Sequence, residues 1–318
     1  MRKDLQETLW KYAEKYRVAE FLEDDPIQIP HRFSKKEDIE ISAFFSAIMA
    51  WGQRKSIIKS GNELLNRMDN APFEFVLNFE KSDERVFQGF VHRTLNSEDI
   101  IFILYRFQSL YKQGKSIESV FGLNSNHDTL ISSTISSNYT DKNTISKEKL
   151  LSLESETGIH SKFIKAGNSS QSSDSSNTYY GKSDSQIFYR EHRVKNAISN
   201  FYDWMFEFGE TRTKKHISDP RKKSACKRIN MYLRWMVRED DGLDFGIWKS
   251  IQPSELMMPL DVHVLRMTEK LEIASNIKGN WDGCEKLTGI FREIHPSDPT
   301  LFDFALFGLG VDYRRQLV

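Results

Sequence analysis

Two predicted helix starts in the C-terminal third of the chain decide the fold. Residues 224–238 read S-A-C-K-R-I-N-M-Y-L-R-W-M-V-R, and residues 259–271 read P-L-D-V-H-V-L-R-M-T-E-K-L. Apolar residues recur at helical spacing in both segments, which predicts two amphipathic helices. Lys227 lies near the start of the first, and Asp261 has the place of an N-cap residue before the second. If the helices pack as a hairpin pair, the two side chains can meet.

The first of these helices is predicted to have one buried and one exposed face. Its apolar stripe consists of Ile229, Tyr232, Leu233, Met236 and Val237. The opposite face carries Lys227, Met231, Arg234 and Arg238. This pattern predicts that the lysine and the two arginines point away from the core.

The remaining sequence favours helices, and no segment has a convincing strand pattern. Residues 39–49 are apolar almost all round, which predicts a central, buried helix. Asn96, followed three positions later by Asp99, has the form of a helix cap before another apolar-periodic segment. We therefore expect an all-α fold.

Composition divides the chain of 318 residues into three parts. Residues 124–186 contain 17 serines among 63 residues and neither Trp nor Pro. Such a segment cannot bury enough apolar surface to offset chain entropy, so we expect a disordered or loosely ordered Ser-rich insertion. It separates an N-terminal helical part, 1–123, from a C-terminal helical part, 187–318, and we expect these two to pack around a groove.

Charge is uneven along a chain whose formal net charge is zero. Residues 211–238 contain ten Lys and Arg and a single acid, Asp219. A local excess of this size indicates a polyanionic partner. The alternative is a basic loop that is simply solvated.

Several classes of protein are disfavoured. The two cysteines, Cys226 and Cys284, are too few for an iron–sulfur or Cys-rich zinc site, and we expect both to be free and reduced. The histidines have no metal-ligand spacing, so we expect neither a metal nor a cofactor. The charged N-terminus does not resemble a signal peptide, and no apolar run approaches a membrane span. These features predict a cytoplasmic protein, and we expect a monomer with no membrane partner.

The segments around Lys227 and Asp261 resemble the helix-hairpin-helix (HhH-GPD) DNA glycosylase superfamily. In that superfamily a lysine opens the helix after the hairpin, and an aspartate in a P-[VL]-D-[VT]-H type of motif opens the next. Here residues 259–263 read P-L-D-V-H, and Lys227 is followed by Asn230 and Met231, most like the archaeal 8-oxoguanine glycosylase branch. The chain also resembles an uncharacterised bacterial family, through D-P-I-Q-I-P-H-R-F at 25–33, A-W-G-Q-R-K at 50–55 and F-D-F-A-L-F-G-L-G-V at 302–311.

The hairpin departs from the glycosylase pattern. Glycosylase hairpins usually carry L-P-G-V-G, whose glycines let backbone N–H groups touch a DNA phosphate. The residues before Lys227 are S-D-P-R-K-K-S-A-C, without glycine. Phosphate contacts are then expected from Arg221, Lys222 and Lys223 together with the helix N-terminus. Further DNA-binding candidates are Arg228, Arg234, Gln53 and Arg54, the glutamine lying where related glycosylases fill the gap left by a flipped base.

The resemblance implies a DNA glycosylase with AP-lyase activity that removes a damaged base, with an oxidised purine as the expected lesion. Lys227 would attack the sugar C1′ and form a Schiff base, while Asp261 would stabilise positive charge on the sugar or help to deprotonate the lysine. Asn230 and His263 are additional candidates, although His263 has the place of a residue that caps or packs.

Three alternatives remain open from the sequence. The lysine and the aspartate could form only a salt bridge that ties two helices together. The chain could be a non-catalytic nucleic-acid-binding protein that keeps the glycosylase-like fold. It could also be a helical enzyme or scaffold that acts on something other than DNA.

Overall fold

A computed structural model of the chain describes residues 1–122, 182–239 and 241–315. The chain divides into two compact units, one formed by Met1–Gly122 with Arg193–Val318 and the other by Leu123–His192. The Ser-rich insertion predicted at 124–186 lies outside the described residues, except for its last residues, which belong to a helix beginning at Lys182. All the candidate site residues belong to the first unit.

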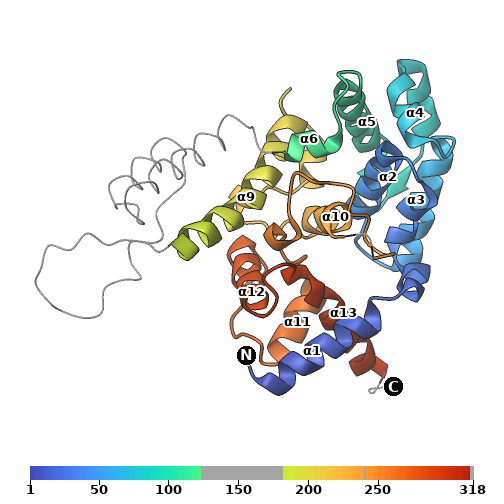
Figure 1. Cartoon of the computed structure of the whole chain (residues 1–318). Helices are drawn as coiled ribbons and strands as arrows, with labels where there is room; N and C mark the ends of the chain where they lie inside the picture. Colours follow the sequence, from blue (N-terminus) through green and yellow to red (C-terminus); the bar gives the residue numbers. More distant parts are fainter. Residues whose placement is uncertain (123–181, 240, 316–318) are drawn as a thin grey trace, which may run out of the picture. The chain divides into compact units, whose positions relative to one another are not determined.

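The described residues are mostly helical, as the sequence predicts. The α-helices are α1 (Lys3–Tyr16), α2 (Lys36–Ile48), α3 (Arg54–Arg67), α4 (Pro72–Asn78), α5 (Ser97–Tyr111), α6 (Ile117–Phe121), α9 (Lys182–Met205), α10 (Lys227–Val237), α11 (Val262–Lys270), α12 (Trp281–Ile294) and α13 (Phe302–Arg315) (Figure 1). Short 3-10 helices lie between them: η1 (Ala19–Asp24), η2 (Pro26–Gln28), η3 (Pro30–Arg32), η4 (Lys81–Phe87), η6 (Arg212–Lys215), η7 (Pro220–Lys222), η8 (Pro253–Glu255) and η9 (Pro299–Leu301).

One small hairpin was not expected. Strands β1 (Val91–His92) and β2 (Leu95–Asn96) pair antiparallel, with Val91 opposite Asn96. Strands of two residues are too short to produce a recognisable alternation of apolar and polar residues. The helix cap predicted just after the hairpin is confirmed, because the Asn96 and Asp99 side chains each accept a bond from the other's backbone N–H.

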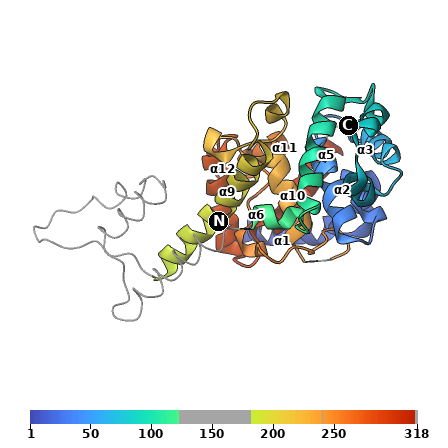
Figure 2. The same cartoon turned by 90° about the horizontal axis from the view of Figure 1, so that it is seen from above.

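Helix α2 is central, as its composition predicts. Every residue from Ile39 to Ile48 is buried, and α2 packs against α3, α4 and α10. The views in Figures 1 and 2 both place α10 beside α2. The one buried carboxylate of this helix, Glu40, accepts hydrogen bonds from Trp248 Nε1 at 2.7 Å and from the Tyr111 hydroxyl at 3.0 Å. Its polar atoms are therefore satisfied inside the core.

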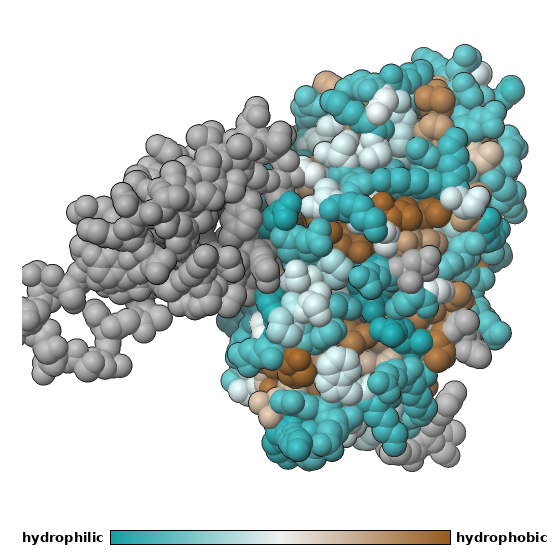
Figure 3. All heavy atoms as spheres, in the orientation of Figure 1, coloured by the Kyte–Doolittle hydropathy of each residue, from teal (hydrophilic) through white to brown (hydrophobic). Residues whose placement is uncertain are grey.

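The N-terminal helix packs against a helix near the C-terminus. Helix α1 lies along α13, which also contacts α11 (Figure 1). The Trp10 ring centroid lies 5.0 Å from that of His295 and 5.1 Å from that of Phe302. The face drawn in Figure 3 is mainly hydrophilic, with apolar residues in separate small patches. Among the described helices, none is both long and apolar enough to cross a membrane.

The prediction that α10 has one buried and one exposed face is wrong at the C-terminal end of the helix. The apolar stripe is buried as expected, but Arg234 and Arg238 are buried too, at 5% and 3% exposure. The reason is that aspartates from segments distant in sequence cover this face and pair with the arginines. Lys227, Arg228 and Met231, in the first part of the helix, are partly exposed.

Candidate functional site: the Lys227–Asp261 pair

Lys227 and Asp261 meet, as their positions at two helix starts predict. Lys227 Nζ lies 3.4 Å from Asp261 Oδ2, and the two side chains are 33% and 25% exposed. The aspartate is also the N-cap of α11, and its Oδ1 accepts the backbone N–H groups of His263 and Val264, each at 2.8 Å. One carboxylate oxygen therefore fixes the helix start, and the other faces the lysine.

A tight turn brings the chain into α10. Lys223 and Cys226 both have left-handed backbone conformations, with φ of 61° and 48°. Glycine adopts this conformation most easily, so here two residues with side chains occupy it where the glycosylase hairpin carries glycines. Asn230, buried in the first part of α10, donates from Nδ2 to the Ala225 carbonyl at 3.0 Å and braces the turn.

Helix α12 supports the backbone before both site residues. Ser224 forms an isolated bridge with Asn280, the N-cap of α12, which holds the turn before Lys227. The segment before Asp261 is buried, and its Met258 donates a backbone N–H to Thr288 Oγ1 at 3.0 Å and accepts a bond from Cys284 Sγ at 3.1 Å. Because one rigid helix holds both segments, the spacing of the lysine and the aspartate is fixed by packing.

Two further carboxylates, which the sequence did not single out, act on the same site. Asp303, in the first turn of α13, is 18% exposed and accepts a hydrogen bond from Arg234 Nη1 at 2.5 Å. Burial raises the pKa of Asp303 to about 6; Arg234 and Lys227 oppose this rise, and Asp261 adds to it. Burial also raises the pKa of Asp25, against the opposing charges of Arg54, Arg234 and Lys227. Lys227 thus shares its surroundings with carboxylates from three separate segments, a pattern that is common in active sites.

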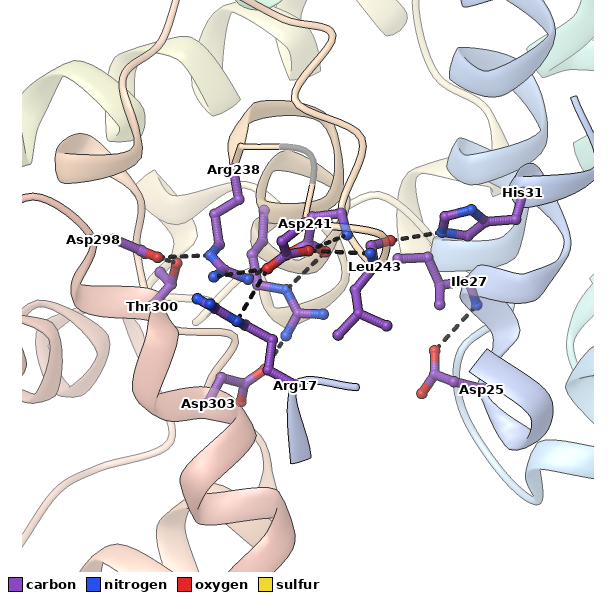
Figure 4. Close-up of polar contacts among 12 residues, drawn as sticks. Arg17, Asp25, Ile27, His31, Arg238, Asp241, Leu243, Asp298, Thr300 and Asp303 are labelled. Carbon is purple, nitrogen blue, oxygen red and sulfur yellow. Dashed lines mark hydrogen bonds and ion pairs between the residues drawn. The ribbon is translucent and has the colours of Figure 1, made fainter. Parts of the chain in front are cut away.

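The two buried arginines of α10 belong to a compact ion network. Arg238 donates to Asp298 and to Asp244, both at 2.7 Å. Arg234 pairs with Asp303 and, at 3.5 Å, with Asp244. Figure 4 shows Arg238 between Asp298 and Asp241, with Arg17 approaching Asp241 from the opposite side. Arg234, predicted to bind DNA, is therefore enclosed by carboxylates and does not reach the surface.

Several other cations of the 211–238 run are also paired with carboxylates of the chain. Arg212 pairs with Asp99, Lys214 with Glu210, and Arg221 with both Asp203 and Asp219. The two aspartates raise the pKa of Arg221.

Lys222, which is exposed, donates to the Tyr202 hydroxyl at 2.8 Å. Lys215 and Lys223 are exposed, with no ion pair among the described residues. The charge excess seen along the sequence is thus largely balanced in space.

The remaining predicted site residues, described one by one, are Arg54, Gln53, His263 and Arg228. Arg54 approaches Asp25, with Nη2 at 3.6 Å from Oδ2. Gln53 is the exposed N-cap residue of α3, and its side chain makes no capping bond. The imidazole of His263 is exposed, and only its backbone N–H contacts Asp261. Arg228 is mostly buried and donates from Nη1 to the Ile48 carbonyl at 2.5 Å.

Both cysteines are free, as predicted, and both are buried. Burial raises the pKa of Cys226 to about 12 and also raises that of Cys284. Each thiol is therefore protonated and packs as a small apolar group. Within the part of the chain that the structure describes, no three His, Cys, Asp or Glu side chains are placed to hold a metal ion.

Comparison with known proteins then assigns the chain to a family. A family model described as a protein of unknown function (DUF2400) matches residues 25–165 and 153–312. The chain belongs to this family. No curated protein and no solved structure matches the chain. For this DUF2400 protein, the likeness to DNA glycosylases therefore rests on the residues around Lys227 and Asp261.

Sequence reasoning missed Asp25 and Asp303 for a physical reason. Both lie in the segments quoted for the bacterial family resemblance, D-P-I-Q-I-P-H-R-F and F-D-F-A-L-F-G-L-G-V. Asp303 is a single acid in an otherwise apolar stretch, which is an uncommon place for a charge and was the available signal. Asp25 follows Glu23 and Asp24 and gave no such signal. Both aspartates are far from Lys227 in sequence, so no local spacing could link them to it.

Proposed function

We propose that this protein is a DNA glycosylase with AP-lyase activity, acting through Lys227, on a helix-hairpin-helix glycosylase-like fold. The observation that carries the proposal is the 3.4 Å approach of Lys227 Nζ to Asp261 Oδ2, at the starts of two helices and with both side chains partly open to solvent. This partial exposure leaves the amine and the carboxylate open to a DNA substrate. The nearby carboxylates with perturbed pKa values add support, because such groups gather at catalytic sites.

The reaction begins with an unprotonated Lys227 amine. Its lone pair forms a bond to the sugar C1′ while the bond from C1′ to the base breaks, and the base leaves with that electron pair and gains a proton. The nitrogen, which loses a proton in this attack, then uses its lone pair to break the C1′–O4′ bond. O4′ takes up a proton as a hydroxyl, and a Schiff base forms between C1′ and Nζ. Loss of a proton from C2′ expels the 3′ phosphate by β-elimination, and water finally hydrolyses the Schiff base and restores the lysine.

Asp261 has a defined part in this chemistry. Its two backbone hydrogen bonds, from His263 and Val264, fix the carboxylate at the N-terminus of α11. The free Oδ2 can then stabilise positive charge that develops on the sugar as the base departs. In the free protein the same oxygen holds the lysine ammonium in place.

The turn before α10 fits the role of a phosphate-contacting hairpin. Lys223 and Cys226 adopt the left-handed conformations for which glycosylase hairpins use glycine. Strained backbone of this kind persists where the surrounding structure enforces it, often beside a ligand. The exposed amines of Lys222 and Lys223 extend from this turn and are its candidate phosphate contacts.

The non-catalytic alternative has less support. A protein that only bound nucleic acid would rely on the 211–238 cations, and six of the ten are engaged with carboxylates of the same chain: Arg212, Lys214, Arg221, Lys227, Arg234 and Arg238. Such pairing lowers the number of charges that can release counterions from DNA. The catalytic proposal needs only the few cations that remain exposed near Lys227.

Borohydride trapping tests the proposal. The protein is incubated with duplex DNA that contains an abasic site or 8-oxoguanine, sodium borohydride is added, and the covalent complex is separated by denaturing electrophoresis. Wild-type protein is expected to give a covalent adduct, and Lys227→Ala none, with DNA binding largely kept. Asp261→Asn, which keeps the side-chain shape, is expected to trap far less. An adduct from Lys227→Ala at the wild-type level would refute the proposal.

A further inference from the structure

The corner between α2 and α3 gathers cations around an indole ring. Trp51 lies in this corner, followed by Gly52 and Gln53. The guanidinium of Arg93, from the β1–β2 hairpin, lies 4.7 Å from the Trp51 ring, and that of Arg228, from the first turn of α10, lies 6.0 Å from it. Three segments that are distant in sequence thus place two arginines against one tryptophan.

Neither of these arginines has a carboxylate partner among the described residues. This separates them from Arg234 and Arg238 on the same helix as Arg228, each of which contacts two or more aspartates. Arg228 has only the Ile48 carbonyl as an acceptor, and burial lowers its pKa with no neighbouring charge to oppose the shift. A mostly buried cation without a counter-charge is costly, and a bound anion would relieve that cost.

The corner is held in place by specific contacts. His92, 3% exposed, links its Nε2 to the Met49 carbonyl and its Nδ1 to Ser60 Oγ, both at 2.9 Å, and so ties the hairpin to α2 and α3. The next residue, Arg93, has a φ of 58°. Gly52 has a φ of 114°, and a Cβ added there would lie 2.8 Å from Arg93 Nη1. The backbone thus keeps the Arg93 guanidinium over the tryptophan.

Hydrogen-bond donors without acceptors accumulate at the same corner. Trp51 Nε1 is buried and has no hydrogen-bond partner within the described chain. Helix α3 begins immediately afterwards, its first turn contains no acid, and its N-cap Gln53 makes no capping bond. The positive end of the helix dipole therefore points toward the corner, and the first turn of α3 itself supplies no negative side chain to balance it.

We propose that Arg93 and Arg228, which both lie near the Trp51 ring at the α2–α3 corner, form a binding site for a phosphate group. Guanidinium groups match the oxygen geometry of phosphate, and a helix N-terminus adds further donors. The phosphate belongs to a phosphodiester of the DNA strand held at Lys227, an identification that rests on the proposed function. Arg228 follows Lys227 directly in α10, so one strand could contact both.

Arg93→Gln is the test variant, because Arg93 is exposed and its loss leaves the core intact. Arg85→Gln is the matched control. Arg85 is an exposed arginine of η4, whose end contacts Arg67 through the carbonyls of Val86 and Gln88. Since Arg67 ends α3 and Arg54 begins it, the control lies about 20 Å from the corner along the helix.

Two measurements are made on the full chain. In the first, phenylglyoxal modification of each arginine is followed by mass spectrometry with and without inorganic pyrophosphate; Arg93 is expected to be protected and Arg85 unchanged. In the second, binding of a duplex with a stable abasic-site analogue is titrated at several salt concentrations. Arg93→Gln is expected to weaken binding and to lower the salt slope by about one, and Arg85→Gln to leave both unchanged.

The combined results distinguish failure of this phosphate site from failure of the proposed function. Pyrophosphate protection of Arg93 without any duplex binding would support a phosphate site for a free phosphate compound and would overturn the DNA reading. Duplex binding by wild type with equal behaviour of Arg93→Gln and Arg85→Gln, and no protection of Arg93, would overturn the site and leave the proposed function standing. Neither protection nor binding would overturn both.

Discussion

At the C-terminal end of α10, Arg238 is 3% exposed and contacts the carboxylates of Asp244 and Asp298, whereas at the N-terminal end Lys227 is 33% exposed and pairs with Asp261. Arg228, beside the lysine, has no carboxylate partner among the described residues. The same helix therefore uses its cations in two ways. Those at one end are neutralised inside the protein, and those at the other remain able to meet a ligand.

This contrast also shows why charge counted along a sequence overstates the charge available to a partner. The acids that balance the 211–238 run come from residues 98–99, 203–210, 241–244 and 298–303. A search for a polyanion site should thus begin from cations that lack an internal partner. Among the described residues, Arg228 at the start of α10 and Arg93 at the α2–α3 corner are two such cations.

The largest expected effect is on stability, at the C-terminal end. Arg238→Met would leave the buried carboxylates of Asp244 and Asp298 without their main partner. Breaking a buried ion pair from one side typically costs about 3–5 kcal/mol, so chemical denaturation should show a loss of that order. Arg238→Met combined with Asp244→Asn should recover part of it. A single variant as stable as wild type would show that the network is not a structural element.

A pH-dependent effect is expected from Asp303. Its pKa is raised by burial from 3.8 to about 6, so between these values the folded protein holds a proton that the unfolded chain releases. The contribution of Asp303 to the free energy of unfolding therefore falls as the pH rises through this interval. Asp303→Asn should remove that dependence, seen as a difference between the two proteins in thermal unfolding from pH 4 to pH 7. Parallel profiles would contradict the raised pKa.

A smaller effect, on DNA binding, distinguishes the exposed cations of the turn before α10 from its paired cation. Replacing Lys222 and Lys223 by Ala should reduce the salt dependence of duplex binding by about two in slope, because each contributes one phosphate contact. Arg221→Ala should change it less, since Asp203 and Asp219 already hold that guanidinium. The comparison is made by fluorescence anisotropy at several salt concentrations. A larger change for Arg221 would mean that its ion pairs open on binding.

The smallest expected effect is on the stability of the site itself. The Lys227–Asp261 pair is 33% and 25% exposed, and such pairs contribute about 0–1 kcal/mol. Lys227→Ala should therefore unfold within about 1 kcal/mol of wild type in denaturant. Asp261→Ala should cost more, because it also removes the N-cap of α11. A large loss for Lys227→Ala would favour the purely structural salt bridge.

The part of the site that could be predicted from sequence is the part encoded locally. Asp261 is recognisable because an N-cap aspartate bonds to residues two and three positions later, and Lys227 because it opens a strongly amphipathic helix. The cap at Asn96 was predictable for the same reason.

What could not be predicted depends on contacts between distant segments. Arg234 is 69 residues from its partner Asp303, so its helix face looked exposed although it is buried. The Arg93 guanidinium lies over Trp51 only because His92 ties a two-residue hairpin to the end of α2. Neither contact leaves a pattern at a fixed spacing in the sequence.

The central claim is that Lys227 is the residue that reacts with DNA, and the attachment point of the trapped sugar tests it most directly. The borohydride-trapped complex on abasic DNA is digested with nuclease and protease, and the modified peptide is sequenced by mass spectrometry. We predict that the sugar remnant is carried by Nζ of Lys227 alone. A remnant on Lys222, Lys223 or the N-terminal amine, with Lys227 unmodified, would contradict the account.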